Sequence, residues 1–293
     1  MESELPPNCT IPARSRRQVM DWGLVLASQE IEAMIVRTDG GWGLVVEESQ
    51  YERAQAALRQ YRVENRGWRW KQQLPGSGIV FHWGALVWVA AMGGFYYWTM
   101  AAVPRLQDAG VMDVRRVAAG EWWRLFTAIT LHENLPHLAA NAATGFLLLG
   151  LAMARYGPGV ALLAAFLAGA AGNAASLMIH SDASQSLGAS GMVTGALGML
   201  SVHSFSLWRK YPAARGLMAR GAVAGFLILV LIGFSPGSDI AAHLGGFVAG
   251  AVIGLAMNAA RPAVWQGGWA NVAAALALAA LAAIAWRQAL PGS

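Results

Sequence analysis

The sequence has few charged residues and a single cysteine. Only 13% of its 293 residues are charged and 56% are hydrophobic, whereas about 25% of the residues of a soluble protein are charged. Cys9 is the single cysteine, which excludes a disulfide within the chain and a cysteine-based metal site. Beyond Glu133 the only carboxylates are Asp182 and Asp239. These shortages exclude a soluble globular protein over most of the chain and indicate a membrane protein.

The distribution of charge indicates two domains. Most of the acidic residues lie before residue 75, and the N-terminus is polar without the apolar core of a signal peptide. We therefore expect an internal helix to direct membrane insertion. The net charge of +5 requires no nucleic-acid partner, because arginine concentrates where a positive-inside topology would place it. The sequence predicts a small soluble domain followed by a domain embedded in a lipid bilayer.

The N-terminal region has the pattern of a small α/β unit over residues 16–65. The segments MIVRT and WGLVVE flank DGG, which indicates a β-hairpin. The segment EESQYERAQAALRQYRVEN follows as an amphipathic helix with an acidic first turn. The segment KQQLPGSG has the composition of a linker. We expect a small cytosolic α/β domain over residues 1–70 and a linker over residues 71–77.

Seven apolar segments after the linker are long enough to cross a bilayer, which takes about 20 residues. They cover approximately 78–102, 135–155, 159–180, 188–208, 215–234, 239–259 and 267–286. A long insertion, 103–134, separates the first two and contains EWWRLF. The expected fold is an all-α polytopic helical bundle.

The basic residues favour one orientation in the membrane. Arg209, Lys210, Arg215 and Arg220 cluster between the fourth and fifth segments, which marks that loop as cytoplasmic. Counting outward places the N-terminal domain inside the cell. The insertion 103–134 and the C-terminus are then outside.

The stretch LHENLPHLAAN, residues 131–141, is close to a zinc-protease motif but does not match it. The motif H-E-x-x-H places two imidazoles one helical turn apart, and Pro136 stands where the second histidine belongs. On a helix, His137 would point about 140° away from His132, so we expect no metal here. His137 and Asn141 share a helical face and form a donor pair suited to an oxyanion. His132 is expected just outside the span as a structural hydrogen-bonder.

The segment SLGASGMVTGALG, residues 186–198, places Ser190 near the first turn of the fourth apolar segment. Gly188 and Gly191 leave the hydroxyl open to approach. The N–H of Ser190 can face a developing oxyanion, because helix N-termini favour negative charge. The alternative interpretation is a small-residue packing face, which Gly195 continues. Both interpretations can hold together.

The segment DIAAHLGGFVAGAVIG, residues 239–254, carries a glycine every four residues. Gly246, Gly250 and Gly254 form a face for close helix approach, and His243 lies on the same face. If this face packs on the fourth segment, His243 meets Ser190 near one membrane surface. A serine hydrogen-bonded to a histidine is a nucleophile with its base. Taken alone, each of these polar residues could also simply hydrogen-bond a neighbouring helix.

In combination, these segments resemble the rhomboid intramembrane serine proteases of the bacterial type. The resemblance rests on Trp123–Arg124, on His132, His137 and Asn141 in HENLPHLAAN, on GASG at 188–191 and on AHLGGFVAG at 242–250. It covers about residues 78–260. It implies a six-helix membrane protease core there, with an additional C-terminal transmembrane helix and tail over residues 261–293.

The resemblance also implies an activity and its residues. The chain would be a serine endopeptidase of a bacterial inner membrane that needs no cofactor or metal. It would cleave the transmembrane segments of membrane-protein substrates in a cavity open to the outside. Ser190 would be the nucleophile and His243 the base, while His137, Asn141 and the Ser190 N–H would bind the oxyanion. The structural residues near the site would be Gly188, Gly191, His132, Trp123, Arg124, Gly246 and Gly250.

The chain departs from the usual rhomboid pattern at two positions. Thr194 stands where relatives often have an aromatic residue against the catalytic imidazole, and Met153 stands where they often have a glutamate. Asp239 is the only carboxylate that could complete a triad with His243. We expect it instead to be the N-cap of the sixth span.

Other functions fit the sequence less well. A catalytically silent rhomboid-like protein that binds client transmembrane helices is the main alternative, but the chain keeps both Ser190 and His243. A transporter predicts buried charges or broken helices near the bilayer midplane, whereas the ionisable groups here gather toward the outer face. An aspartyl intramembrane protease would need a pair of intramembrane aspartates, which the sequence lacks.

Overall fold

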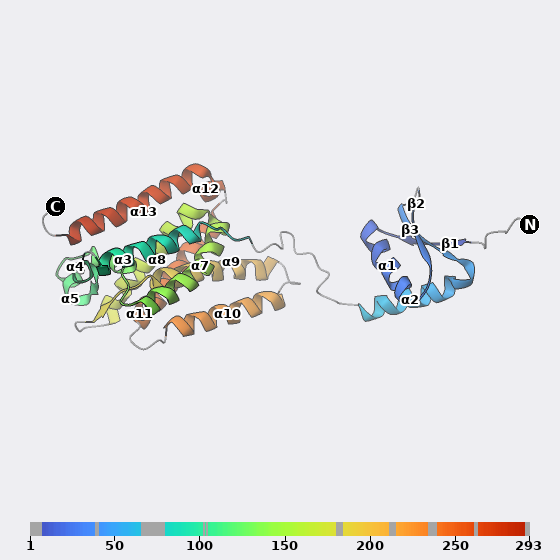
Figure 1. Cartoon of the computed structure of the whole chain (residues 1–293), viewed down its shortest axis with the longest axis horizontal. Coiled ribbons are helices and arrows are strands. Elements are labelled where there is room, and N and C mark those ends of the chain that lie inside the picture. Colours follow the sequence, from blue (N-terminus) through green and yellow to red (C-terminus); the bar gives the residue numbers. More distant parts are fainter. Residues whose placement is uncertain are drawn as a thin grey trace, which may run out of the picture. The chain divides into compact units, whose positions relative to one another are not determined.

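The computed structural model describes residues 8–38, 41–65, 80–101, 103, 105–179, 184–210, 215–233, 239–260 and 263–290. The chain divides into two compact units, Met1–Gln73 and Leu74–Ser293 (Figure 1). The first is a small α/β unit and the second is a bundle of helices. The predicted fold class, a helical membrane bundle with a small N-terminal α/β domain, is confirmed.

The N-terminal unit is a three-stranded sheet with two helices. Its main elements are β1 (Asn8–Ala13), α1 (Arg16–Ser28), β2 (Ala33–Thr38), β3 (Gly41–Glu47) and α2 (Tyr51–Glu64). The sheet is antiparallel in the order β1-β3-β2. Trp22 and Leu26 of α1 lie in one buried cluster with Leu44 of β3 and Leu58 of α2. The predicted pair of strands and the predicted helix are therefore present.

The N-terminal unit includes one strand, β1, that was not predicted from the sequence, since the expected α/β unit starts at residue 16. This strand contains Pro12, which lacks an N–H and is disfavoured inside a sheet. As an edge strand, β1 tolerates it, and Pro12 pairs with Gly43 in the register. Asp39 and Gly40 of the predicted hairpin turn, and the predicted linker 71–77, lie outside the described residues.

Among its described residues, the second unit contains seven long helices in the order that the apolar segments predict. They are α3 (Ala85–Ala101), α7 (Leu135–Tyr156), α8 (Pro158–Ile179), α9 (Ser190–Lys210), α10 (Arg215–Gly233), α11 (Ile240–Ala259) and α13 (Gly268–Ala289). Four of them, α7, α8, α11 and α13, meet criteria of length and hydropathy for crossing a membrane among the described residues. The first helix begins later than predicted, at Ala85 rather than near residue 78. The chain is an integral membrane protein.

Short elements fill the insertion between α3 and α7. They are α4 (Arg105–Gly110), β4 (Met112–Asp113), α5 (Val114–Ala118), α6 (Arg124–Thr127) and the 3-10 turn η3 (Ala128–Thr130). A second two-residue strand, β5 (Gln185–Ser186), pairs with β4. The segment before α9 is thereby joined to the insertion.

Helix α9 packs against α7, α8 and α11, and a run of its residues from Gly191 to Met199 is buried. The contact with α11 runs backbone against backbone. A Cβ added at Gly250 would overlap the carbonyl of Gly195, and one added at Gly246 would overlap that of Gly191. The sequence expectation that these two glycine faces meet is confirmed.

The helix α13 packs along α8 (Figure 1). Asn271, near its start, bonds to the first turn of α8. The Oδ1 of Asn271 accepts from the N–H groups of Gly159 and Val160, at 3.1 and 3.2 Å. Pro158 has no N–H, and the N–H of Ala161 reaches the Gly157 carbonyl at 2.9 Å. The four amide positions at the start of α8 are thus accounted for, two of them by a side chain from another helix.

Candidate active site

Ser190 is the first residue of α9. The chain approaches it through Gly188, whose φ of +125° favours glycine. The Gly188 N–H donates to the carbonyl of Ala128 at 2.9 Å, so η3 holds the segment just before the serine. The N–H of Ser190 belongs to the first turn of α9, and such amides have no acceptor inside their own helix.

His243 lies one turn into α11. Asp239 caps this helix, because its Oδ1 accepts from the Ala242 N–H at 2.9 Å, as the sequence predicts. The imidazole is 5% exposed, and its Nε2 is 2.6 Å from the Ser190 Oγ. The structure therefore brings together the two residues that the sequence paired, across 53 positions of the chain.

His137 and Asn141 approach the same place from α7. Asn134 caps this helix by accepting from the His137 N–H at 2.8 Å, and Pro136 lies in its first turn, as predicted. A Cβ added at Gly188 would be 2.7 Å from the His137 Nε2 and 3.7 Å from the Asn141 Nδ2. Both donors therefore face the segment that leads into Ser190. One hydrogen of the Asn141 amide donates to the His137 carbonyl at 3.0 Å, which leaves its second hydrogen for another acceptor.

The structure corrects the expectation for His132. This residue precedes the cap of α7, so the helical angle does not apply, and its ring lies edge-on to His137 with the ring centres 5.4 Å apart. It is 1% exposed, and neither ring nitrogen has a hydrogen-bond partner among the described residues. Only its backbone serves the predicted bonding role, because its carbonyl accepts from the Gln107 Nε2 at 3.1 Å. His132 is thus a packing residue beneath His137.

The burial of His132 predicts a dependence of stability on pH. Burial, and secondarily the nearby His137 ring, lowers the pKa of His132 from 6.5 to about 4. Between these values the unfolded chain binds a proton that the folded chain does not, so the free energy of unfolding falls as pH falls. The loss reaches on the order of 3 kcal/mol by pH 4.

We expect a His132→Phe variant, which keeps an aromatic ring in this place, to lose less stability than the wild type on acidification. The measurement is thermal unfolding of both proteins in detergent at pH 7.5 and pH 5. Equal losses of melting temperature in the two proteins would contradict the assignment.

Arg124 organises the insertion next to the site. It is 2% exposed, and its Nε bonds Glu121 at 2.6 Å. One terminal nitrogen donates to the carbonyls of Asp108 and Val111, at 2.9 and 2.7 Å. Trp123 precedes it as the N-cap residue of α6. The Trp–Arg pair therefore lies in the fold of the insertion rather than at the reacting groups.

Asp113 joins the insertion to the segment before Ser190. Its Oδ2 accepts from the Gln185 Nε2 at 3.0 Å, and its Oδ1 accepts from the Arg116 N–H at 3.0 Å. The Gln185 bond, followed by the Arg116 bond, lowers the pKa of this carboxyl below its ordinary value. Neither residue was singled out from the sequence, since two-residue strands leave no periodic pattern.

The two departures from the rhomboid pattern occupy packed positions. Thr194 is fully buried, and its hydroxyl donates to the Gly191 carbonyl at 3.0 Å beside Gly246. A small side chain suits this place, because the α11 backbone passes close by. Met153 is 1% exposed within the hydrophobic core formed with α3 and α8.

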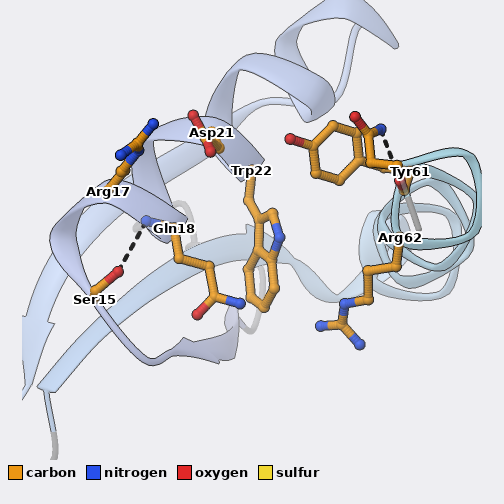
Figure 2. A pocket seen from close by; sticks show the side chains of 8 residues that line it. Ser15, Arg17, Gln18, Asp21, Trp22, Tyr61 and Arg62 are labelled. Carbon is orange, nitrogen blue, oxygen red and sulfur yellow. Dashed lines mark hydrogen bonds between the residues drawn. The ribbon is translucent and has the colours of Figure 1, made fainter. Parts of the chain in front are cut away.

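Neither a metal cluster nor a surface hollow provides an alternative site among the described residues. The described residues contain no cluster of three or more histidine, cysteine or acidic side chains that could hold a metal. A surface hollow of about 400 Å³ lies between α1 and α2 of the N-terminal unit (Figure 2). The Arg62 guanidinium lies 4.7 Å from the Trp22 ring centre there, and the lining includes no nucleophile with an adjacent base. The Ser190–His243 pair remains the candidate site.

Comparison with known proteins bears on the same residues. The sequence profile of the family described as "Rhomboid domain" matches residues 119–260, which contain Ser190 and His243. The chain is 32% identical over 162 residues to "RHOMBOID-like protein 5" of Arabidopsis thaliana, covering 53% of this chain and 50% of that protein. It is 33% identical over 147 residues to "Rhomboid protease GluP" of Bacillus subtilis (strain 168), covering 48% of this chain and 27% of that protein. The matches span half or less of the length of these relatives. The rhomboid-domain match at residues 119–260 contains the candidate site, and together these findings support membership of the rhomboid family.

Proposed function

We propose that this chain is an intramembrane serine endopeptidase with Ser190 as nucleophile and His243 as general base. The observation that carries the proposal is the 2.6 Å separation of the Ser190 Oγ and the His243 Nε2, which come from two different helices. A serine hydroxyl is a weak nucleophile until an adjacent base accepts its proton. The name of the Bacillus subtilis relative, a rhomboid protease, supports the same activity.

The reaction follows from this pair. With the imidazole proton on Nδ1, Nε2 accepts the Ser190 proton while Oγ attacks the carbonyl carbon of the scissile peptide. The tetrahedral intermediate collapses, the C–N bond breaks, and His243 gives the proton to the leaving amine. Water then attacks the acyl-serine with Nε2 as its base. The second tetrahedral intermediate then breaks its bond to the Ser190 Oγ, which takes the proton back from the His243 Nε2, and the carboxylic acid is released.

The oxyanion of the intermediate would be bound by three donors. They are the His137 imidazole, the second Asn141 amide hydrogen and the Ser190 N–H. Their positions around Gly188 support this role, since that residue lies between α7 and the start of α9. Donors fixed before the reaction stabilise developing charge without reorganising.

The substrates that we propose are transmembrane segments of other membrane proteins. Both Ser190 and His243 lie at the N-terminal ends of long helices, and therefore near a membrane surface rather than at the midplane. The basic cluster of Arg209, Lys210, Arg215 and Arg220 supports a cytoplasmic location for the opposite ends. The site then opens to the outside of a bacterial inner membrane, the N-terminal domain is cytosolic, and residues 78–260 form the protease core.

The test is to offer the full-length protein a fluorophosphonate, which reacts with activated serines, and a transmembrane test substrate. The wild type should be labelled and should cleave, and Ser190→Ala should do neither. A folded wild type that binds the substrate helix but shows neither reaction would support the alternative, a silent rhomboid-like binding protein.

Asp239 tests whether the catalytic residues form a dyad or a triad. Its Oδ1 caps α11, and its Oδ2 accepts from the Ser176 hydroxyl at 2.6 Å, which supports a dyad without a third acid. Asp239→Asn keeps a capping oxygen and should leave kcat within about tenfold of wild type, whereas a triad acid replaced by its amide loses about 10⁴. Asp239→Ala should cost about 1 kcal/mol of stability. A folded Asp239→Asn protein with almost no activity would establish a triad instead.

A further inference from the structure

The indole of Trp286 lies where α13 meets the insertion. Its ring centre is 5.3 Å from that of Phe95 on α3. A Cβ added at Gly110, the last residue of α4, would be 2.6 Å from the indole Cη2. Trp286 is half-buried, whereas Trp269 on the same helix is 88% exposed. The residue also lies beyond the rhomboid-domain match, which ends at residue 260.

A series of hydrogen bonds leads from this indole into η3. The Trp286 Nε1–H donates to the Thr130 Oγ1 at 3.2 Å, and the Thr130 hydroxyl donates to the Thr127 carbonyl at 2.7 Å. The Thr127 hydroxyl donates to the Gly110 carbonyl, also at 2.7 Å. The indole therefore contacts this series of bonds at both ends. Its N–H bonds to Thr130, and its ring packs against Gly110.

The turn that Trp286 contacts is the one that holds the segment before Ser190. The carbonyl of Ala128, two residues before Thr130, accepts from the Gly188 N–H. Ala128 is 1% exposed, so no water competes for this carbonyl from bulk solvent. Gly188 in turn lies against His137 and Asn141. A displacement of η3 would move the Ser190 N–H relative to the other two oxyanion donors.

We propose that Trp286 is a positioning residue for the oxyanion site, acting through Thr130 and the Ala128 carbonyl. The helix outside the rhomboid domain would then contribute to the chemistry without touching substrate. This inference rests on the proposed function, since it concerns the donors of that reaction. A change in donor alignment weakens binding of the transition state more than binding of the substrate, so the effect should fall on kcat.

The test compares Trp286→Phe with Trp269→Phe as the matched control, in full-length protein with a transmembrane test substrate. Trp286→Phe keeps the ring and removes the N–H, and loss of one such bond should lower kcat by about three- to tenfold with KM unchanged. Thr130→Val should give the same loss, whereas Thr130→Ser keeps the hydroxyl and should retain wild-type kcat. The double variant Trp286→Phe/Thr130→Val should have a kcat no lower than that of either single variant. Trp269→Phe should match wild type.

Three results would overturn the inference while leaving the protease assignment intact: a Trp286→Phe kcat equal to that of the control, a change confined to KM, or additive losses in the double variant. A purely structural role would lower the melting temperature and leave the kcat of the folded protein unchanged. If the wild type neither cleaves nor shows Ser190-dependent labelling, the proposed function fails, and this inference fails with it.

Discussion

Ser190→Ala and His243→Ala are each expected to abolish cleavage of a transmembrane test substrate while the protein stays folded. The two side chains form the 2.6 Å contact between α9 and α11, and removal of a nucleophile or its base typically costs up to about 10⁶ in kcat. Because they act as one unit, the double variant should be no less active than either single variant. The measurement is the single-turnover rate in proteoliposomes.

Folding of these variants is assessed by thermal unfolding. The helix contact depends on glycines rather than on this pair, so both variants should unfold within a few degrees of wild type. Ser201→Ala is a matched control, since the Ser201 hydroxyl on the same helix donates to the Leu197 carbonyl. More than a tenth of wild-type activity in either active-site variant would exclude the dyad.

The second large effect is expected at the oxyanion donors. His137→Ala and Asn141→Ala should each lower kcat by about 10² to 10³, with little change in KM, because these bonds strengthen in the transition state. The loss should be smaller than at Ser190, since two donors remain in each variant. The measurement is the separate determination of kcat and KM.

Thr144→Ala is the control on the same helix. Thr144 lies about one turn beyond Asn141, and its hydroxyl donates to the Ala140 carbonyl of the same helix. Loss of this hydroxyl should therefore leave kcat unchanged. If instead the His137 and Asn141 variants raised KM and spared kcat, these residues would bind substrate or a neighbouring helix rather than the oxyanion.

The meeting of Ser190 with His243 could be predicted because glycine spacing identifies a helix face. Gly246 and Gly250 are four residues apart, so the spacing identifies the face of the helix that carries His243 even without the helix that packs on it. The pairing of His137 with Asn141 followed in the same way from a spacing of four. Regular periodicity on regular helices is what made this part of the site predictable.

Contacts made by irregular backbone could not be predicted in this way. The Ala128 carbonyl that holds Gly188 belongs to a 3-10 turn in a long insertion, and backbone groups carry no signal in the sequence. The bond from Ser176 to Asp239 joins two helices at positions that no repeat identifies. His132 lies just outside the span, as predicted. The expectation that its ring and that of His137 point apart was wrong, because it assumed a continuous helix, whereas α7 begins only after the Asn134 cap.

The capping of α8 by Asn271 has a consequence for synthesis of the chain. The cap lies 112 residues after the Gly159 amide that it binds, so α8 leaves the ribosome and enters the bilayer long before its cap exists. Amides at a helix end in a membrane need an acceptor, and those of Gly159 and Val160 must use water or lipid headgroups in the interval. Arrival of α13 replaces these temporary acceptors, so the start of α8 is completed only by a helix that is synthesised much later.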